Sequence, residues 1–226
     1  MSETQWKVGV LGSGDVGKAL AVGFAKYGHD VIVGTRSPEK LRDWRSGTAS
    51  QVEGAGRHGT IGVGSFADAA EFGDVVVLAT LFTGTEHAIE LAGPKQFAGK
   101  VVIDATNPLQ FRDDGPPTLI YGHTDSGGEH VQQWIPNARV VKAFNIVGNR
   151  HMVDPDFPGG TPDMFICGND ADAKQTVEAI LTQFGWNTVD IGGIEGSRLL
   201  EPLCILWVVY GLTTNTWDHA FALLRK

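Results

Sequence analysis

Short apolar runs alternate with segments of helical periodicity along most of this chain. The runs are rich in β-branched residues, as expected of strands that are covered on both faces. They fall at residues 7–11, 30–34, 74–80, 100–105 and 139–144. After the first run, Val16, Leu20 and Phe24 recur at helical spacing, and Ser65 is placed to cap a short helix over 66–72. This alternation predicts an α/β fold with an open, mostly parallel, doubly wound sheet of the Rossmann type.

The last third of the chain continues the α/β pattern and then becomes almost wholly apolar. Strands are predicted at 163–168 and 186–191, on either side of a helix that Asp170 caps and Gly185 ends. The final predicted helix, 197–212, has apolar residues nearly all the way round, so we expect it to be buried against a second subunit. We therefore expect a nucleotide-binding domain at 1–148 and a continuous C-terminal α/β extension at 149–226.

Two stretches lack periodicity. Residues 46–60 are polar and glycine-rich, which predicts a surface loop. Residues 110–125 contain Asp, Gly and Pro without a repeat and predict a long loop of the kind that forms lids or binding loops. Directly afterwards, Ser126 and Glu129 fit a capping box that opens a helix.

A glycine-rich turn follows the first strand. Gly12, Gly14 and Gly17 fit the spacing G-x-G-x-x-G between a strand and a helix. The first glycine permits the tight turn, the second lets a pyrophosphate approach the backbone, and the third lets the helix pack close to its strand. The helix N-terminus then offers free N–H groups to the anion. The whole turn is therefore predicted to bind a dinucleotide, and it consists of Gly12, Ser13, Gly14, Asp15, Val16 and Gly17.

The residues that follow the second strand favour NADP over NAD. An NAD site places Asp or Glu there to hold the ribose 2′-hydroxyl. This chain has Thr35, Arg36 and Ser37, with Lys40 one turn later. Hydroxyls and a guanidinium can bind a 2′-phosphate by charge-assisted hydrogen bonds. The alternative is that Arg36 is a solvated loop residue.

Two further strand ends are expected beside the cofactor. Ligands of open α/β sheets bind at the carboxyl ends of strands, which places the segment Ala79 to Thr83, with Ala79, Thr80 and Leu81 among its residues, near the dinucleotide. Asn107 follows the next strand and either contacts the nicotinamide or ribose or caps its own turn. Pro108 ends that strand and stiffens the turn.

Composition limits the possible partners. The 226 residues are 42% hydrophobic and 19% charged, and the net charge is −8, which disfavours nucleic acid and anionic membranes. Cys167 and Cys204 lie in apolar runs, as expected of core residues in a reducing compartment. Since no signal-peptide pattern and no long apolar segment is present, we expect a soluble cytoplasmic protein.

No acid/base or metal motif accompanies the nucleotide site. The seven histidines lack metal-ligand spacing, and no His or Lys stands in a recognisable catalytic motif. Alcohol dehydrogenases need a general acid/base, whereas transfer between two redox cofactors needs mainly ring positioning. We therefore expect hydride transfer without a catalytic side chain and without a metal.

Together these stretches resemble a known family. The segments GSGDVG, VGTRS, VVLAT, DATNP, VVKAFN, DMFICGNDADAK and SRLLEPL are similar, in order and spacing, to NADPH-dependent coenzyme F-420 reductases, and more weakly to the oxidoreductase domain of membrane ferric reductases. The resemblance covers nearly the whole chain. It implies a Rossmann domain with a small C-terminal extension, a homodimer, and reversible hydride transfer between NADP(H) and a deazaflavin.

The resemblance also implies positions on the acceptor side. Ala143 to Asn145 would lie where the two rings meet, and Asn145 and Arg198 are the acceptor-side candidates. Arg112, Arg150 and Arg198 are possible counter-charges for an anionic acceptor, although Arg198 can equally pair with Glu201 or Glu195.

The acceptor itself stays open. It is a deazaflavin, a flavin, a metal chelate or another small oxidant. Two other functions remain as alternatives: an NADP-binding redox sensor without turnover, and an imine or carbonyl reductase.

Overall fold

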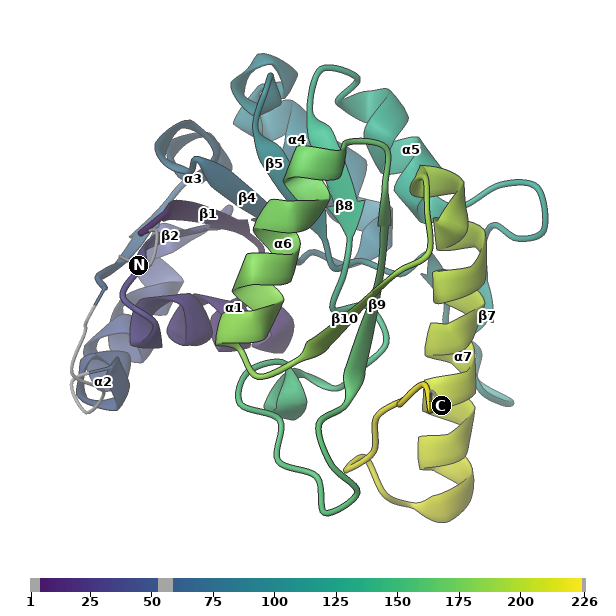
Figure 1. Ribbon diagram of the computed structural model, residues 1–226. Helices are drawn as coiled ribbons and strands as arrows, with labels where there is room; N and C mark the ends of the chain where they lie inside the picture. The colour runs from purple at the N-terminus through teal and green to yellow at the C-terminus, as the bar shows by residue number, and fades with distance from the viewer. Residues whose placement is uncertain (1–4, 53–58, 225–226) are drawn as a thin grey trace.

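An eight-stranded sheet forms the middle of the molecule (Figure 1). The computed structural model describes residues 5–52 and 59–224. In spatial order the strands are β10 (Asn187–Asp190), β9 (Asp163–Gly168), β8 (Arg139–Lys142), β5 (Val101–Asp104), β4 (Val75–Leu78), β1 (Lys7–Leu11), β2 (Asp30–Gly34) and β3 (Ile61–Gly64). The predicted strands are therefore confirmed, with ends shifted by one or two residues.

The strand order reverses between β1 and β4. From β1 the chain builds outwards through β2 to β3, then returns to β4 and builds in the other direction through β5 to β8. All these neighbours pair in parallel, whereas β9 pairs antiparallel with β8. The point of reversal in a doubly wound sheet is where ligands bind, so the fold itself places a site beyond β1 and β4.

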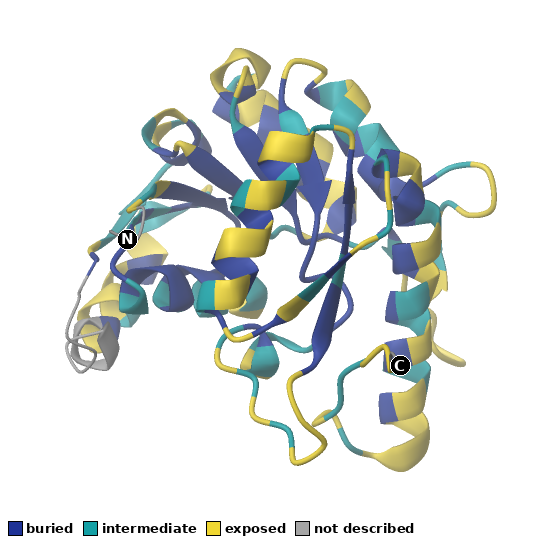
Figure 2. Ribbon diagram, viewed as in Figure 1, coloured by how far each residue is buried: buried dark blue, intermediate teal, exposed yellow. Residues whose placement is uncertain are grey.

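Helices cover both faces of the sheet, and each face has its own core (Figure 2). One core contains side chains of α1 (Asp15–Lys26) and α6 (Ala171–Gln183), including Leu20, Phe24 and Ile180. The other contains side chains of α3 (Phe66–Phe72), α4 (Thr85–Ala92) and α5 (Gly127–Trp134). Strand side chains alternate between the two cores, which explains the unbroken apolar runs.

Several predicted helix ends are confirmed by their hydrogen bonds. Ser65 and Asp68 form a complete capping box at the start of α3. The Asp170 side chain accepts the N–H of Ala173 at the start of α6, and Gly185 beyond its end has φ of +88°. These local motifs involve residues three positions apart, so the sequence pattern identifies them directly.

The two predicted loops both contain regular structure. The loop prediction for 46–60 is wrong over its first half, because α2 (Arg42–Val52) reaches Val52; residues 53–58 lie outside the described part of the chain. The loop predicted at 110–125 includes a small hairpin of β6 (Leu109–Gln110) and β7 (Thr118–Leu119). Two-residue strands are too short to show an alternating pattern.

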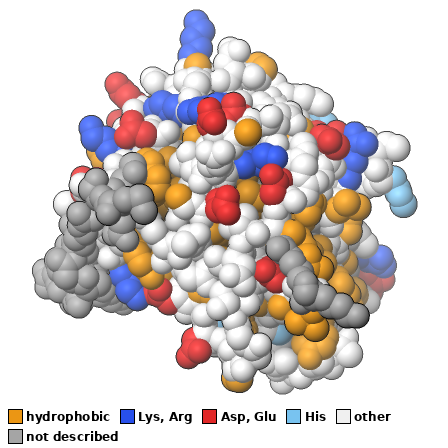
Figure 3. All heavy atoms as spheres, in the orientation of Figure 1, with side chains coloured by type: hydrophobic (Ala, Val, Ile, Leu, Met, Phe, Trp, Pro, Cys, Tyr) orange, Lys and Arg blue, Asp and Glu red, His pale blue; other side chains and the backbone are white. Residues whose placement is uncertain are grey.

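The helix α7 (Ser197–Thr214) lies at the edge of the molecule beside α5 and β9 (Figure 1). Leu200, Cys204 and Trp207 are buried by the rest of the chain, whereas Leu199 and Leu206 are 69% and 56% exposed. One side of α7 is therefore exposed in the single chain, and its burial against a second subunit stays a prediction. Figure 3 shows hydrophobic side chains gathered over this part of the surface.

The boundary expected at residue 148 falls between β8 and β9, which are neighbours in one sheet, and the division into two domains stays a prediction. Within the described residues, no helix is long and apolar enough to cross a membrane.

Candidate functional site

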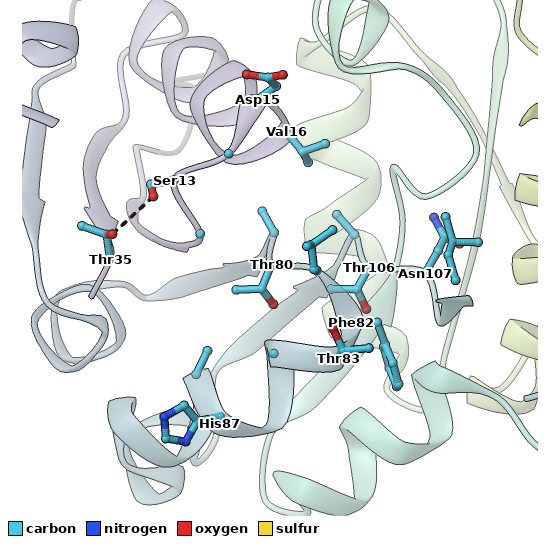
Figure 4. Close-up of a pocket in the computed structure, with 18 of the residues that line it drawn as sticks. Ser13, Asp15, Val16, Thr35, Thr80, Phe82, Thr83, His87, Thr106 and Asn107 are labelled. Carbon is cyan, nitrogen blue, oxygen red and sulfur yellow. Dashed lines mark hydrogen bonds between the residues drawn. The ribbon is translucent and has the colours of Figure 1, made fainter. Parts of the chain in front are cut away.

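A cleft of about 710 Å³ opens where the strand order reverses (Figure 4). It lies beyond the carboxyl ends of β1, β2, β4 and β5, so four parallel strands contribute to one site. Figure 4 shows it running from Ser13 and Thr35, past Thr80, to Thr106 and Asn107. The predicted residues that line it are Gly12, Ser13, Gly14, Asp15, Val16, Thr35, Arg36, Ala79, Thr80, Leu81 and Asn107.

The three glycines of the first turn are needed for different reasons. Gly12 has φ of +131°, and a Cβ there would lie 2.3 Å from the carbonyl oxygen of Ala79. A Cβ on Gly17 would lie 2.1 Å from the carbonyl oxygen of Gly12, so this residue packs α1 against the turn and does not line the cleft. A Cβ on Gly14 would have no atom within 4 Å. Gly14 is therefore open towards solvent and free to accept a ligand against its backbone.

The N-terminus of α1 has no side-chain cap. The helices α3, α5 and α6 each use a Ser or Asp side chain as a cap, whereas Gly14 provides none for α1. The first N–H groups of a helix lack intrahelical partners and carry the positive end of its dipole. Since Gly14, Asp15 and Val16 line the cleft, these donors are available to an anion in it.

The end of β2 supplies hydroxyl and basic groups at one end of the cleft. Ser13 Oγ and the Ser37 N–H both donate to Thr35 Oγ1, each at 3.3 Å. Arg36 is exposed and lines the cleft, whereas Ser37 and Lys40 do not line it. Among the described residues, neither Arg36 nor Lys40 forms an ion pair, so both charges are free to meet a ligand.

The other end of the cleft is largely apolar. Leu81 and Phe111 line it while remaining 73% and 70% exposed, whereas Phe82, which lies towards the Asn107 end of the cleft in Figure 4, lines it as a buried wall. The Phe82 ring contacts Tyr121 edge to face and lies against Trp134, so the wall is fixed from behind. The apolar end of the cleft therefore suits a flat, apolar ring system.

Asn107 is held in place from below. Its side-chain amide donates to the main-chain oxygen of Asn145 at 2.8 Å, and the Asn145 amide donates back to Asn107 Oδ1 at 3.0 Å. The Asn145 amide also donates to the carbonyl of Leu200 in α7. Phe144 has φ of +64°, which is unusual for a bulky residue and turns Asn145 towards Asn107.

Not every predicted residue reaches the cleft surface. Ala143 and Asn145 are buried, and neither they nor Pro108 are among the lining residues. Asn145 thus contacts the site only through Asn107.

Arg198 pairs with a carboxylate that the sequence did not suggest. Its guanidinium binds both oxygens of Glu129, with Nε 2.8 Å from Oε2, instead of Glu201 or Glu195. The hydrogen bonds from Arg198 hold the pKa of Glu129 below its usual value. The predicted capping box at Ser126 is therefore only half formed: Ser126 Oγ accepts the Glu129 N–H, while the Glu129 carboxylate accepts from the Ser126 hydroxyl and from Arg198.

The other two possible counter-charges lie elsewhere. Arg112 pairs with Asp114 on the surface. Arg150 lines a separate groove between α1 and residues 149–154.

A fully buried charged cluster lies beneath the cleft and was missed from the sequence. Lys142 Nζ lies 2.8 Å from Asp104 Oδ2 and 3.1 Å from Glu201 Oε1. Burial disfavours the charged lysine, but the two carboxylates outweigh that effect and raise the pKa of Lys142. Two features of the sequence could have indicated the cluster. Asp104 and Lys142 are charged residues at the ends of two buried strands, and Glu201 lies within an apolar helix.

Phe82 and Thr83, which also line the cleft, belong to the predicted segment Ala79 to Thr83. The remaining lining residues were missed, among them a histidine. His87 projects from α4 at the opposite side of the cleft from Asn107 (Figure 4). Its Nδ1 lies 3.2 Å from Glu90 Oε2. The others are Phe66, Gly84, Ala88, Ala105, Thr106, Leu109 and Phe111. Most of them follow β4 or β5, where strand-end reasoning extended further would have included them. In the described residues, no group of three His, Cys, Asp or Glu side chains is arranged to hold a metal ion.

Comparison with known proteins gives a consistent set of relatives. A family model described as "NADP oxidoreductase coenzyme F420-dependent" matches residues 7–108. The F420-dependent NADP reductase of Methanothermobacter thermautotrophicus is 30% identical over 89% of this chain and 88% of its own. A crystal structure from Arthrobacter sp. FB24, provisionally described as an F420-dependent NADP reductase, has a TM-score of 0.86 and 36% identity, covering 97% of this chain and all of that one.

Other relatives differ in length or share only the fold. The rat metalloreductase STEAP3 is 28% identical over 87% of this chain, which spans only 36% of that protein. The human metalloreductase STEAP2 is similarly longer, with 41% of its length matched. A reductive aminase from Aspergillus terreus in complex with NADPH has a TM-score of 0.65 at 20% identity.

Proposed function

This chain belongs to the family of F420-dependent NADP reductases, and from that premise we propose that it binds NADP(H) in the cleft and transfers a hydride between it and a flat, flavin-like acceptor. The nicotinamide ring supplies the hydride. The chain itself supplies binding, orientation and exclusion of water. The coarser activity, that of an NADP-dependent oxidoreductase, agrees with the descriptions of the matching family model and of the Methanothermobacter reductase.

One observation carries the NADP assignment: the N-terminus of α1, which has no side-chain cap, faces the same cleft as Arg36, which forms no ion pair with any described residue. The pyrophosphate would lie against Gly14 and the first turn of α1, where N–H groups are unsatisfied. The 2′-phosphate would lie at Thr35 and Arg36, with Lys40 nearby. Asp15 is exposed, and its carboxylate points away from Thr80 in the middle of the cleft (Figure 4), so a phosphate meets its backbone and not its charge.

The acceptor assignment rests on the apolar end of the cleft. Ala79, Thr80 and Asn107 would flank the nicotinamide and its ribose. Leu81 and Phe111 then offer exposed apolar surface beyond them. Burying that surface against a planar ring system favours a deazaflavin or flavin, at about 25 cal/mol per Å² of apolar area removed from water.

An acceptor screen tests this proposal. Purified protein would be given NADPH with coenzyme F-420, FMN, FAD or a soluble ferric chelate, and oxidation of NADPH would be followed. We expect turnover with F-420 or a flavin. Turnover with the ferric chelate alone would replace the proposed flavin-like acceptor by a metal chelate. A further arm with a cyclic imine tests the imine-reductase alternative, which turnover there would favour. Binding of NADPH without turnover in any arm would favour a redox sensor.

We also propose that the protein is a homodimer through the exposed face of α7. Leu199, Leu206 and Tyr210 recur at helical spacing and are 69%, 56% and 51% exposed. Light scattering after size exclusion should give twice the chain mass for the wild type and a monomer for Leu206→Glu. The control Leu91→Glu, on exposed α4 surface, should leave the mass unchanged; a monomeric wild type would contradict the proposal.

A further inference from the structure

The ammonium group of Lys142 uses all three of its donors inside the protein. It donates to Asp104 Oδ2 at 2.8 Å and to the main-chain oxygen of Thr106 at 2.9 Å, and it lies 3.1 Å from Glu201 Oε1. Lys142 and Asp104 are completely buried, and Glu201 is 1% exposed. No water is needed to complete this cluster, so its geometry is set by the protein alone.

Two of these interactions hold one residue of the cleft. Thr106 donates its N–H and its hydroxyl to Asp104 Oδ1, at 2.9 and 2.6 Å, while its carbonyl accepts from Lys142. Both main-chain polar groups of Thr106 are therefore fixed by the buried charges. Thr106 lines the cleft and precedes Asn107, which lines it too.

The third interaction connects this segment to distant parts of the fold. The Glu201 carboxylate accepts the N–H groups of Gly127 and Gly128 at 3.0 and 2.9 Å, so it caps the first turn of α5. The positive end of the α5 dipole partly balances the second carboxylate of the cluster. Lys142 thus joins β5, α5 and α7 at a single point beneath the cleft.

Stability alone does not explain such an arrangement. Taking a lysine and two carboxylates out of water is costly, and replacing buried ion pairs by apolar groups is often neutral or stabilising. A buried, fully bonded network does define one geometry closely. Here the geometry that it defines is that of residues 106 and 107.

We propose that Lys142, held by Asp104 and Glu201, is a positioning residue of the hydride-transfer site, which fixes Thr106 and Asn107 against the nicotinamide end of the cofactor. This inference rests on the proposed function. It concerns only one end of the cleft, because within the described residues no hydrogen bond or ion pair joins the cluster to Gly14, Thr35 or Arg36 at the phosphate end.

The experiment separates the two ends of the cleft. Adenosine 2′,5′-bisphosphate carries the 2′-phosphate and has no nicotinamide, so its binding by calorimetry reports the phosphate end alone. The fluorescence anisotropy of bound NADPH reports how firmly the nicotinamide is held, and single-turnover oxidation of bound NADPH by the acceptor found in the screen reports transfer. The variants are Lys142→Met, the milder Glu201→Gln, and the double variant.

A matched control is available at Lys100. Its ammonium donates to the main-chain oxygens of Ala70 and Glu71 at 2.7 and 3.2 Å, away from the cleft. Lys100→Met therefore removes a partly buried lysine from main-chain acceptors without touching residue 106.

We expect Lys142→Met and Glu201→Gln to bind adenosine 2′,5′-bisphosphate with a Kd within twofold of that of the wild type. Bound NADPH should show lower fluorescence anisotropy in both variants. Hydride transfer should be roughly 10- to 100-fold slower, because a small misplacement of the reacting ring has an effect of this size. The double variant should be no slower than Lys142→Met, because both act through Thr106. Lys100→Met should match the wild type.

Two results would overturn the inference: unchanged anisotropy and transfer in Glu201→Gln, or a parallel loss of bisphosphate binding in both variants, which indicates a purely structural role. If Lys142→Met does not fold, Glu201→Gln decides between these results. A wild type that binds neither NADPH nor the bisphosphate would instead refute the proposed function.

Discussion

Substitution of Gly14 by alanine should separate cofactor binding from folding. The backbone at Gly14 has φ of −75° and ψ of −176°, an extended conformation that alanine adopts readily. A Cβ there meets no atom within 4 Å. The added methyl group would, however, stand where a pyrophosphate approaches the first turn of α1.

The effect on stability is small because two contributions oppose each other. Alanine restricts the unfolded chain and stabilises by ~0.4–1 kcal/mol, while an alanine N-cap is poorer than glycine by up to about 1 kcal/mol. For a chain of this size the Tm should stay within about 4 °C of the wild type. The effect on binding is larger, since losing one hydrogen bond to a charged phosphate costs ~1.5–3 kcal/mol, which is roughly 10- to 150-fold in Kd.

The matched comparison is Gly12→Ala. Gly12 has φ of +131°, and its Cβ would overlap the carbonyl of Ala79 at 2.3 Å. Backbone strain alone costs ~1–3 kcal/mol, so this variant should lose stability before any ligand is added.

Thermal unfolding and fluorescence titration with NADPH measure both effects. We expect Gly14→Ala to unfold like the wild type and bind NADPH weakly, and Gly12→Ala to unfold at a lower temperature. Wild-type affinity in Gly14→Ala would refute the placement of the pyrophosphate at this turn.

Three further predictions concern charge and titration. Arg36→Ala should weaken NADPH by roughly 10- to 150-fold but leave NADH nearly unchanged, since only NADPH carries the 2′-phosphate; equal losses in both titrations would show that Arg36 does not bind it. Arg198 lowers the pKa of Glu129, so their interaction stabilises the folded state at pH values above the ordinary Glu pKa and is lost as the pH falls through the lowered pKa. The difference in urea midpoint between the wild type and Arg198→Ala should therefore shrink on acidification. A difference that stays constant with pH would contradict this. Burial raises the pKa of Cys167 to about 11 and of Cys204 to about 12, so both thiols should resist a thiol reagent at neutral pH until urea is added, and rapid labelling of the native protein would refute their burial.

Local patterns in the sequence predict the strands and most helix ends. The cap at Ser65 and the stop at Gly185 each depend on neighbours within four residues, and both are confirmed. The β6–β7 hairpin was missed because two residues per strand carry no periodicity. The helix α2 was missed because its polar residues are typical of a loop. In the structure the side-chain hydroxyls of Ser46 and Thr48 donate to main-chain carbonyls four residues earlier, which are one helical turn away.

The candidate site shows the same division between local and distant information. The glycine turn and Arg36 follow directly from strand ends, and the structure brings them to one cleft. The partner of Arg198 was misassigned because Glu129 lies 69 residues away in the sequence. Lys142 was read as part of a strand, since nothing in its neighbourhood reveals that Glu201 and Asp104 converge on it.

The position of Glu201 in the chain has a consequence for how the protein is made. Gly127, whose N–H group Glu201 accepts, precedes it by 74 residues. At a synthesis rate of ~5–20 residues per second, α5 and its cap Ser126 emerge roughly 4–15 s before Glu201, which accepts the first N–H groups of the helix. Lys142 is made 59 residues before Glu201, so for about 3–12 s Asp104 is its only carboxylate partner in the cluster. We therefore expect the phosphate end of the cleft to form early on the ribosome, and the segment at residues 106 and 107 to settle only when α7 arrives.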